Sequence, residues 1–511
     1  MSTEPDDAQV SRDELREATL GGLRWVTLAR GAAELCAFGS MVVLAHLVPP
    51  AEFGALAVAL MVSEFANGLA GEGIGTPLVQ RKTVARVHLQ AAALLSLACG
   101  LVLTVATFVA APIVCAPLFG DRVAELFQLF SPAFLIAAAT VVPRAVLQRK
   151  LAFRRLSQIE IAALAAAMTT SVSLAFAGLD AEALVLGNLA GGCVALVLLL
   201  AATRVPLPRW RPAETRELLA FGTPATISGL AWTATRNVDY AILGARLSAA
   251  QVGFYWRAFT LAVEYQRKLS GIVIQMALPV FSRAQGVEHM RAIRERIVRV
   301  NATLLFPFLA TFVAVAPELV PWLLGERWEP AVLPAQILAV AGMAAVVNTG
   351  TGQMVLAAGA PRAIMRFNLV QLALYAGLVY ALAPAGLTAV CAGVAAFRVV
   401  MLIASYRLLM ERVVGVTLGQ LARDVAPALT GAVAMVAVEL PIVAGLAAAG
   451  AAVPVTLGVA ATAGGLAYLA VIRGLFAGAW SDLELVASRL LPGRRRSSES
   501  PVVPIPSSSP S

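Results

Sequence analysis

Residues 88–112 read HLQAAALLSLACGLVLTVATFVAAP and contain no Asp, Glu, Lys or Arg. An α-helix needs about 20 apolar residues to cross the hydrocarbon core of a bilayer, so this stretch is long enough to span a membrane. The whole chain shares its character, because 59% of all residues are hydrophobic and only 14% are charged. Soluble domains are about one quarter charged. The sequence therefore predicts an all-α integral membrane protein.

About fourteen stretches of comparable length and polarity follow one another along the chain. The connections between them are short, and none is long enough to hold a folded domain outside the membrane. The stretches lie near residues 25–48, 54–79, 88–112, 125–147, 157–177, 181–203, 219–245, 254–282, 296–323, 332–357, 364–384, 386–409, 425–447 and 451–475.

Basic residues are concentrated in alternate connections. They are frequent after the even-numbered stretches, as in residues 144–155 and 283–299, whereas the opposite connections carry only Arg122, Arg246 and Arg327. Cytoplasmic connections of membrane proteins are enriched in Lys and Arg. We therefore expect the even-numbered helices to end in the cytoplasm and both termini to be cytoplasmic. This placement accounts for the net charge of +9 without a nucleic-acid partner.

Similar motifs recur in the two halves of the chain, in the same order and about 200 residues apart. Residues 51–54 (AEFG) match 250–253 (AQVG), residues 118–122 (LFGDR) match 323–327 (LLGER), and the pair Pro77/Arg81 matches Pro279/Arg283. An offset of six helices preserves orientation in the membrane. The repeat therefore predicts two six-helix lobes, related as parallel repeats around a central cavity, plus two C-terminal helices.

The predicted boundaries follow from these patterns. We expect a cytoplasmic N-terminal segment at 1–22, an N-lobe of helices 1–6 at 23–205, and a C-lobe of helices 7–12 at 206–413. Helices 13 and 14 would occupy 414–476. Residues 477–511 would form a disordered cytoplasmic tail, because their end is rich in Ser and Pro.

Charged residues within the predicted helices gather in helices 1, 2, 7 and 8, which are equivalent in the two repeats. A charge at membrane depth costs about 2.5–3.5 kcal/mol on insertion scales, so these helices are expected to line a water-filled cavity. Only Glu160, Arg398 and Glu439 lie elsewhere. The candidates for substrate binding are Arg236, Lys268, Arg267, Arg30, Arg257 and Asn237, and the candidates for ion or proton coupling are Asp239, Glu64, Glu72, Glu34 and Glu264.

The residues alone leave structural interpretations open. Arg30 and Arg257 lie near helix ends, from which a guanidinium can reach the membrane surface. The neighbours Arg30/Glu34 and Arg236/Asp239 could equally be internal ion pairs that only fix packing. Arg257, Glu264 and Lys268 follow a spacing that places them on one helical stripe. Five cysteines and three histidines are dispersed, so no metal or other cofactor is expected.

Several motifs together resemble a known family. They are residues 47–54 (LVPPAEFG), 143–154 (PRAVLQRKLAFR), 237–244 (NVDYAILG), 253–255 (GFY), 279–283 (PVFSR) and 325–328 (GERW). These are similar to the Wzx-type oligosaccharide flippases, in the polysaccharide-exporter branch of the MOP superfamily near the colanic-acid exporter. One departure is the pair Arg267 and Lys268, at a place where a plainer stretch is expected in relatives.

The resemblance implies a non-enzymatic, multi-pass protein of the bacterial cytoplasmic membrane. It would move polyprenyl-pyrophosphate-linked oligosaccharide repeat units from the inner to the outer leaflet by alternating access, for exopolysaccharide, capsule or O-antigen synthesis. Membrane lipids and polysaccharide assembly enzymes are the partners it implies, and a proton or sodium gradient is the candidate driving force. The alternatives are a multidrug or organic-cation exporter of the same superfamily, a flippase for the peptidoglycan lipid precursor, and a membrane glycan glycosyltransferase, polymerase or ligase.

Overall fold

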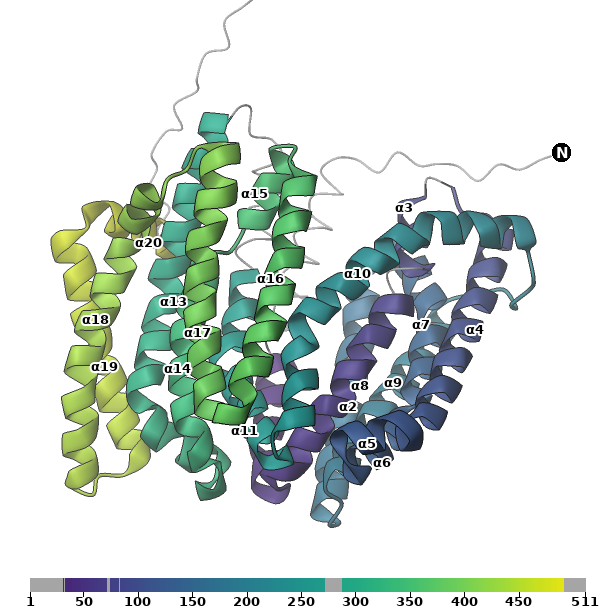
Figure 1. The fold of residues 1–511 in the computed structure, drawn as a ribbon, viewed down its shortest axis with the longest axis horizontal. Coiled ribbons are helices and arrows are strands. Elements are labelled where there is room, and N and C mark those ends of the chain that lie inside the picture. Colours follow the sequence, from purple (N-terminus) through teal and green to yellow (C-terminus); the bar gives the residue numbers. More distant parts are fainter. Residues whose placement is uncertain (1–30, 32, 71–73, 82, 272–286, 491–511) are drawn as a thin grey trace, which may run out of the picture. The chain divides into compact units, whose positions relative to one another are not determined.

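The computed structural model describes residue 31 and residues 33–70, 74–81, 83–271 and 287–490. These residues form helices joined by short connections, with no strand among them (Figure 1). After a helix at Ala33–Leu47, the first half contains α2 (Pro50–Ala70), α3 (Thr76–Gln80), α4 (Arg86–Ala110), η2 (Ala111–Cys115), α5 (Ala116–Phe119), α6 (Asp121–Phe130), α7 (Pro132–Arg149), α8 (Phe153–Phe176) and α9 (Ala181–Ala202).

The second half is also helical. Its elements are α10 (Pro212–Arg246), α11 (Ala249–Phe259), η3 (Thr260–Glu264), α13 (Val287–Leu324), η4 (Glu326–Ala331), α14 (Val332–Val347), α15 (Thr351–Ala357), α16 (Pro361–Leu382), η5 (Ala383–Ala385), α17 (Leu387–Ser405), η6 (Tyr406–Val414), α18 (Leu418–Ala448), α19 (Val453–Leu475) and α20 (Ala477–Leu490). The prediction of an all-α membrane protein is confirmed.

Ten helices in the described part of the chain are long and apolar enough to cross a membrane. They coincide with the predicted helices 3–6 and 9–14. The other four predictions correspond to two shorter apolar helices, Ala33–Leu47 and Pro50–Met61, and to the regions of α10 and α11. Helices 1, 2, 7 and 8 are also those with the intramembrane charges. That these four helices also span the membrane therefore stays a prediction.

Two glycines show that the repeated motifs share a backbone conformation. Gly120 has φ = 91° and Gly325 has φ = 99°, a region that residues with a Cβ rarely adopt. Each glycine ends one helical segment, and the next segment starts at the following residue, Asp121 or Glu326. The equivalent sequences LFGDR and LLGER thus turn the chain in the same way, which supports the predicted repeat.

The other repeated motif brings the starts of α2 and α11 into direct contact. A Cβ atom on Gly54 would overlap the carbonyl oxygen of Ala249, and one on Gly253 would overlap the carbonyl oxygen of Pro50. The two glycines occupy equivalent positions in AEFG and AQVG. Small residues permit such close approach of helix backbones in membrane proteins. The contact is reciprocal, as expected where two repeats meet across their symmetry axis.

Arg122 joins three helices of the first half. Its guanidinium donates to Glu52 of α2, at 2.7 Å for the shortest contact, and to Glu182 at the start of α9, at 2.6 Å. A longer bond of 3.3 Å reaches Glu125, one turn along α6. Charge-assisted bonds to carboxylates are stronger than those between neutral groups. Arg122 therefore fixes the ends of α2, α6 and α9 relative to one another.

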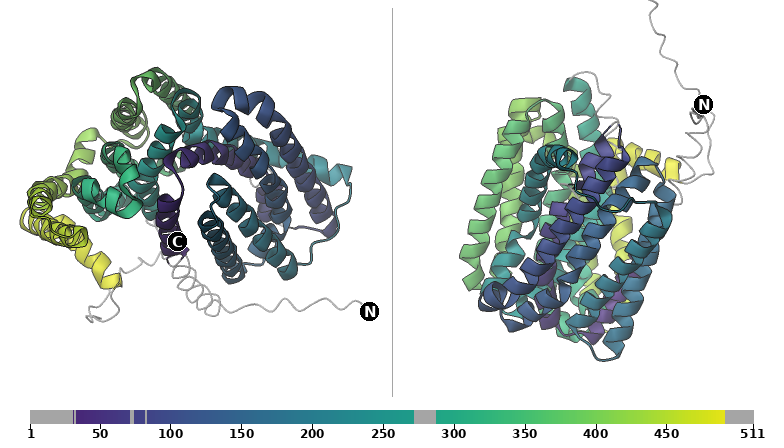
Figure 2. Two further views of the ribbon diagram at one scale, coloured as in Figure 1. Left: turned by 90° about the horizontal axis from the view of Figure 1, so that it is seen from below. Right: turned by 90° about the vertical axis from the view of Figure 1, so that its right-hand side faces the viewer.

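The described residues pack as two compact units. The first contains the described residues up to Tyr265, together with Val315–Ala341 and Met365–Met401. The second contains the described residues between Gln266 and Ala314, together with Gly342–Ile364 and the described residues from Leu402 onward. Within the second unit, α18 and α19 run side by side as a pair (Figure 2). Because α13, α14, α16 and α17 contribute to both units, the predicted lobe boundaries stay a prediction.

The prediction of a disordered tail from residue 477 is wrong for residues 477–490, which form α20. Asp482 of α20 accepts a bond of 2.7 Å from Arg299 of α13 and lies 3.4 Å from Arg296. Arg473 of α19 packs on the ring of Trp480. Hydropathy does not detect a short helix that is held by ion pairs with a distant segment. Residues 491–511 lie outside the described residues.

Candidate functional site

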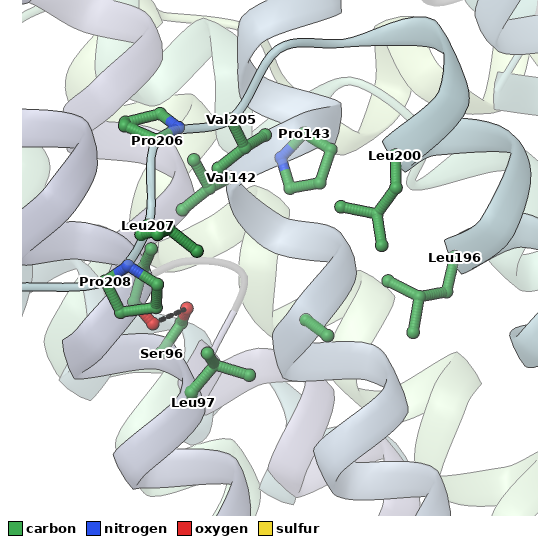
Figure 3. A pocket seen from close by; sticks show the side chains of 12 residues that line it. Ser96, Leu97, Val142, Pro143, Leu196, Leu200, Val205, Pro206, Leu207 and Pro208 are labelled. Atoms are coloured by element: carbon green, nitrogen blue, oxygen red, sulfur yellow. Dashed lines mark hydrogen bonds between the residues drawn. The ribbon is translucent and has the colours of Figure 1, made fainter. Parts of the chain in front are cut away.

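Two cavities in the first unit differ sharply in polarity. The first, of about 310 Å³, lies between α4, α7, α9 and the segment 205–208. Figure 3 shows Leu196 and Leu200 facing Val142 and Pro143 across it. The described residues that line this cavity are all uncharged. It is therefore suited to apolar chains and not to an ionic group.

The second cavity, of about 440 Å³, is bordered by α2, α6, α7 and α9 and has polar side chains in its wall. Glu64, Thr140, Arg144 and Asn188 all line it. Arg144 donates to Glu160 of α8 at 2.8 Å. Within the described part of the chain, Glu64 has no hydrogen-bond or ion-pair partner, and its side chain is exposed. Two charged groups therefore line this cavity: the Glu64 carboxylate, which has no partner among the described residues, and the Arg144 guanidinium, which is already bonded to Glu160.

Arg236 of α10 faces Glu264 at the end of η3. Their closest atoms, Nη2 and Oε1, are 3.8 Å apart, and the two side chains keep 37% and 29% of their surfaces exposed. At this distance the Arg236 and Glu264 side chains form an ion pair but no close hydrogen bond. In the predicted membrane helices 7 and 8, two partly exposed charges would be unfavourable against lipid, so we expect this face to meet water. The neighbouring Asn237 amide instead donates to the Thr233 carbonyl at 3.0 Å.

The predicted stripe of Arg257, Glu264 and Lys268 is interrupted by the π-helical turn η3 at Thr260–Glu264. A π turn holds an extra residue, so side chains beyond it are rotated relative to those before it. Arg257, which precedes the turn, is only 5% exposed, whereas Lys268, which follows it, is exposed. The Arg257 guanidinium carbon lies 4.0 Å from the Phe53 ring centroid and 4.7 Å from that of Trp256. The aromatic rings, and not open space, surround this cation.

Asp239 is buried at the centre of a hydrogen-bonded group in the second half. Its Oδ2 accepts from the hydroxyls of Tyr255 in α11, at 2.7 Å, and Tyr375 in α16, at 2.9 Å. Its Oδ1 accepts from the backbone N–H of Tyr240 at 3.0 Å. Arg236 does not pair with Asp239, contrary to one interpretation of the sequence, because it faces Glu264 instead. Asp239 therefore links α10, α11 and α16.

We expect Tyr375→Phe to destabilise the protein measurably. The change removes one of three donors to a buried carboxyl group and leaves the ring in place, and a hydrogen bond typically contributes about 0.5–1.5 kcal/mol. Thermal unfolding in detergent should show a lower midpoint. Tyr380→Phe is the matched control, because Tyr380 is an exposed tyrosine one helical turn further along α16. Equal midpoints for the two variants would contradict the role of the Asp239 group.

The remaining predicted residues are distributed unevenly. Glu34 is exposed on the first helix, Arg267 is half-buried, and Arg30 and Glu72 lie outside the described residues. The structure thus pairs Arg236 with Glu264 and separates Arg257 and Asp239 from any open surface. Sequence reasoning missed Tyr255, although it lies in the GFY motif. It also missed Tyr375 and Asn188, which stand in apolar runs without a distinguishing pattern.

Three of the motifs that carry the family resemblance meet around Trp328. The Trp328 indole is fully buried and donates to the Ala45 carbonyl at 2.9 Å. Phe53 and Phe254 approach it with ring centroids at 5.4 Å and 6.0 Å. Segments 47–54, 253–255 and 325–328 therefore have a packing role in this chain, since their aromatic side chains form one cluster.

A comparison with known families identifies the chain. The family described as "Polysaccharide biosynthesis protein" matches residues 43–333. The chain belongs to this family. Among its relatives, this polysaccharide biosynthesis protein is 27% identical over 406 residues to "Lipopolysaccharide biosynthesis protein WzxC" of Escherichia coli K12, covering 78% of the chain and 82% of the relative. It is 23% identical over 354 residues to "Teichuronic acid biosynthesis protein TuaB" of Bacillus subtilis 168, covering 66% and 71%.

Solved structures show which fold this polysaccharide biosynthesis protein shares. The lipid II flippase MurJ in an inward closed conformation matches with a TM-score of 0.70 at 11% identity, covering 88% of this chain and 99% of MurJ. A multidrug resistance MATE transporter of the MOP superfamily, in an inward-facing conformation, matches with a TM-score of 0.61 at 14% identity, covering 75% and 94%. The chain therefore shares the all-α transporter fold of these two proteins, as the resemblance implies.

Proposed function

We propose that this protein flips polyprenyl-pyrophosphate-linked oligosaccharide units from the inner to the outer leaflet of the bacterial cytoplasmic membrane. The observation that carries the proposal is the partly exposed Arg236–Glu264 pair at membrane depth, in a chain of the polysaccharide biosynthesis family. A lipid-linked glycan has a polar head that must cross the hydrocarbon core, and it needs polar groups there. An arginine can hold its pyrophosphate through paired charge-assisted bonds. The activity proposed is transport and not catalysis.

The family relatives support this class of cargo over the alternatives. WzxC and TuaB are named for the biosynthesis of lipopolysaccharide and teichuronic acid, which are both glycans. The likeness to MurJ and to a MATE transporter supports a fold that a membrane exporter would use. Their sequence identities to this chain are low, so we infer the class of cargo from the family relatives instead. We infer a glycan on a lipid carrier, with polysaccharide assembly enzymes and membrane lipids as its other partners.

We propose the two-lobe organisation, with lobes at 23–205 and 206–413 and both termini in the cytoplasm. The matching turns at Gly120 and Gly325 and the reciprocal Gly54–Gly253 contact support the repeat. Parallel repeats can rock about an axis along the membrane normal and expose a shared cavity to either side. The alternation of basic connections supports the orientation. Alternating access would then carry the glycan across.

A deletion strain tests the proposed function. We expect cells that lack the chain to accumulate the complete lipid-linked oligosaccharide on the inner leaflet, with little mature polymer at the surface. Lipid extraction and mass spectrometry measure the accumulation. An unchanged lipid pool would contradict flipping, and faster accumulation of a drug in the deletion strain would favour the multidrug alternative.

Glu64 is our proposed coupling residue, since it is an unpaired carboxylate that lines the polar first-half cavity. Glu64→Gln should remove the dependence of flipping on an ion gradient and leave passive exchange between leaflets intact. Proteoliposomes with an imposed proton or sodium gradient give the measurement, as the final ratio of substrate in the two leaflets. We expect this ratio to fall to the value found without a gradient. Glu125→Gln, at an exposed acid, is the control, and a gradient response retained by Glu64→Gln would exclude this role.

A further inference from the structure

One acidic residue of the membrane helices lies outside every site described above. Glu439 stands in α18, one of the two helices beyond the repeat, and its side chain is fully buried. Its Oε1 accepts a hydrogen bond of 2.8 Å from the Thr311 hydroxyl of α13. Its Oε2 is buried and has no hydrogen-bond partner among the residues that the structure describes. A buried carboxyl oxygen without a partner is rare in proteins and calls for a physical explanation.

The backbone of α19 closes the other side of this carboxyl group. A Cβ atom on Gly464 would lie 2.6 Å from Glu439 Cδ and would overlap Oε1. Glycine at position 464 therefore makes the space that the Glu439 side chain fills. The carboxyl group is held between α13 and α19, with the hydrogen atom of Gly464 against it and no surface open to solvent.

Among the described residues, none forms an ion pair with Glu439. Thr311 on α13 and Gly464 on α19 are not ionisable, and the titratable side chain that follows on α19 is Tyr468, whose hydroxyl donates to the Thr303 carbonyl. The other acid of α18, Asp424, is several turns away and is bonded to Arg294 at 2.6 Å. A desolvated carboxylate is stable when it has an ion pair and several hydrogen bonds. Glu439 has a single hydrogen bond, so the neutral acid is the form that this environment favours.

We propose that Glu439 is a proton-binding site, occupied at neutral pH, whose neutral carboxyl group docks the α18–α19 pair on α13. The proton resides on the carboxyl oxygens, and Thr311 donates to Oε1. Removal of the proton would leave an uncompensated carboxylate between two helices and would weaken their contact. After loss of the proton, two other contacts would still join the helix pair to α13. They are the bond between Asp424 and Arg294 and the bond between Tyr468 and the Thr303 carbonyl.

Infrared spectroscopy of the purified full-length protein tests this directly. We expect the wild-type minus Glu439→Gln difference spectrum at pH 7 to contain the carbonyl band of a neutral carboxylic acid. A carboxylate band in its place would overturn the proposal. Glu484→Gln is the control, because Glu484 is exposed on α20; its difference spectrum should contain carboxylate bands.

A second variant keeps the test independent of how Glu439→Gln folds. Thr311→Val leaves the carboxyl group in place and removes its one donor, so the neutral-acid carbonyl band should move to higher frequency. A band that does not move would contradict the site. Neither spectrum requires a transport assay. The proton-binding site can therefore be refuted without refuting the proposed flippase activity, and the flippase activity without refuting the site.

Discussion

Arg236→Ala should abolish export of the polysaccharide while the amount of the protein in the membrane stays normal. The guanidinium is partly exposed and lies 3.8 Å from Glu264, so its loss leaves no fully buried charge behind. Little stability should therefore be lost. A charge-assisted bond contributes about 1.5–3 kcal/mol, which corresponds to roughly 10–100-fold in binding of a pyrophosphate. Surface polymer and immunoblots of the membrane fraction give the two measurements.

A matched control separates this effect from a general loss of positive charge. Arg407 is exposed and forms an ordinary pair with Glu411 one turn away, so Arg407→Ala should export normally. Lys268, the exposed cation beyond the π-helical turn, should behave like Arg236 when replaced by alanine. Wild-type export by both Arg236→Ala and Lys268→Ala would refute their role in the cavity.

Gly54→Leu is expected to have the largest effect on folding. Even a Cβ atom at this position overlaps the carbonyl oxygen of Ala249, and a backbone atom cannot swing aside as a side chain can. Overpacking of a close contact typically costs about 1–3 kcal/mol, and the leucine side chain would force α2 and α11 further apart. We expect a large drop in the thermal midpoint and no export.

The reciprocal nature of this contact gives a sharper test. Gly54→Ala and Gly253→Ala should lower the midpoint by similar amounts, because each new methyl group meets the opposite backbone. Gly377→Ala is the control, since a Cβ there meets nothing within 4 Å. If both equivalent glycines accept alanine as readily as Gly377 does, the tight crossing of the two repeats is refuted.

Hydropathy was sufficient to predict the helices that are purely apolar. It located all ten helices that satisfy the length and polarity of a membrane span, and the repeat motifs located equivalent glycines at 120 and 325. Charged residues also distinguished the predicted helices 1, 2, 7 and 8 from the purely apolar ones. Composition and periodicity carry such information because burial in lipid acts on each helix separately.

Contacts between distant segments were not predictable in this way. The π-helical turn at Thr260–Glu264 has no sequence signature, and neither has the contact that places Arg257 on the Phe53 ring. Tyr375 looks like any apolar residue of its helix until folding places it beside Asp239. The helix α20 depends on Asp482 meeting Arg299, which is far away in sequence. Tertiary packing decides each of these cases.

Reconstitution of the purified protein provides the most direct test of the central claim. Lipid-linked oligosaccharide extracted from the deletion strain would be incorporated into liposomes, and the glycan exposed on the outer surface would be followed with an added glycosidase. We predict that wild-type protein makes the glycan of the inner leaflet accessible, whereas liposomes with Arg236→Ala protect it as protein-free liposomes do. Protection of the inner-leaflet glycan in liposomes that contain the folded wild-type protein would contradict the account.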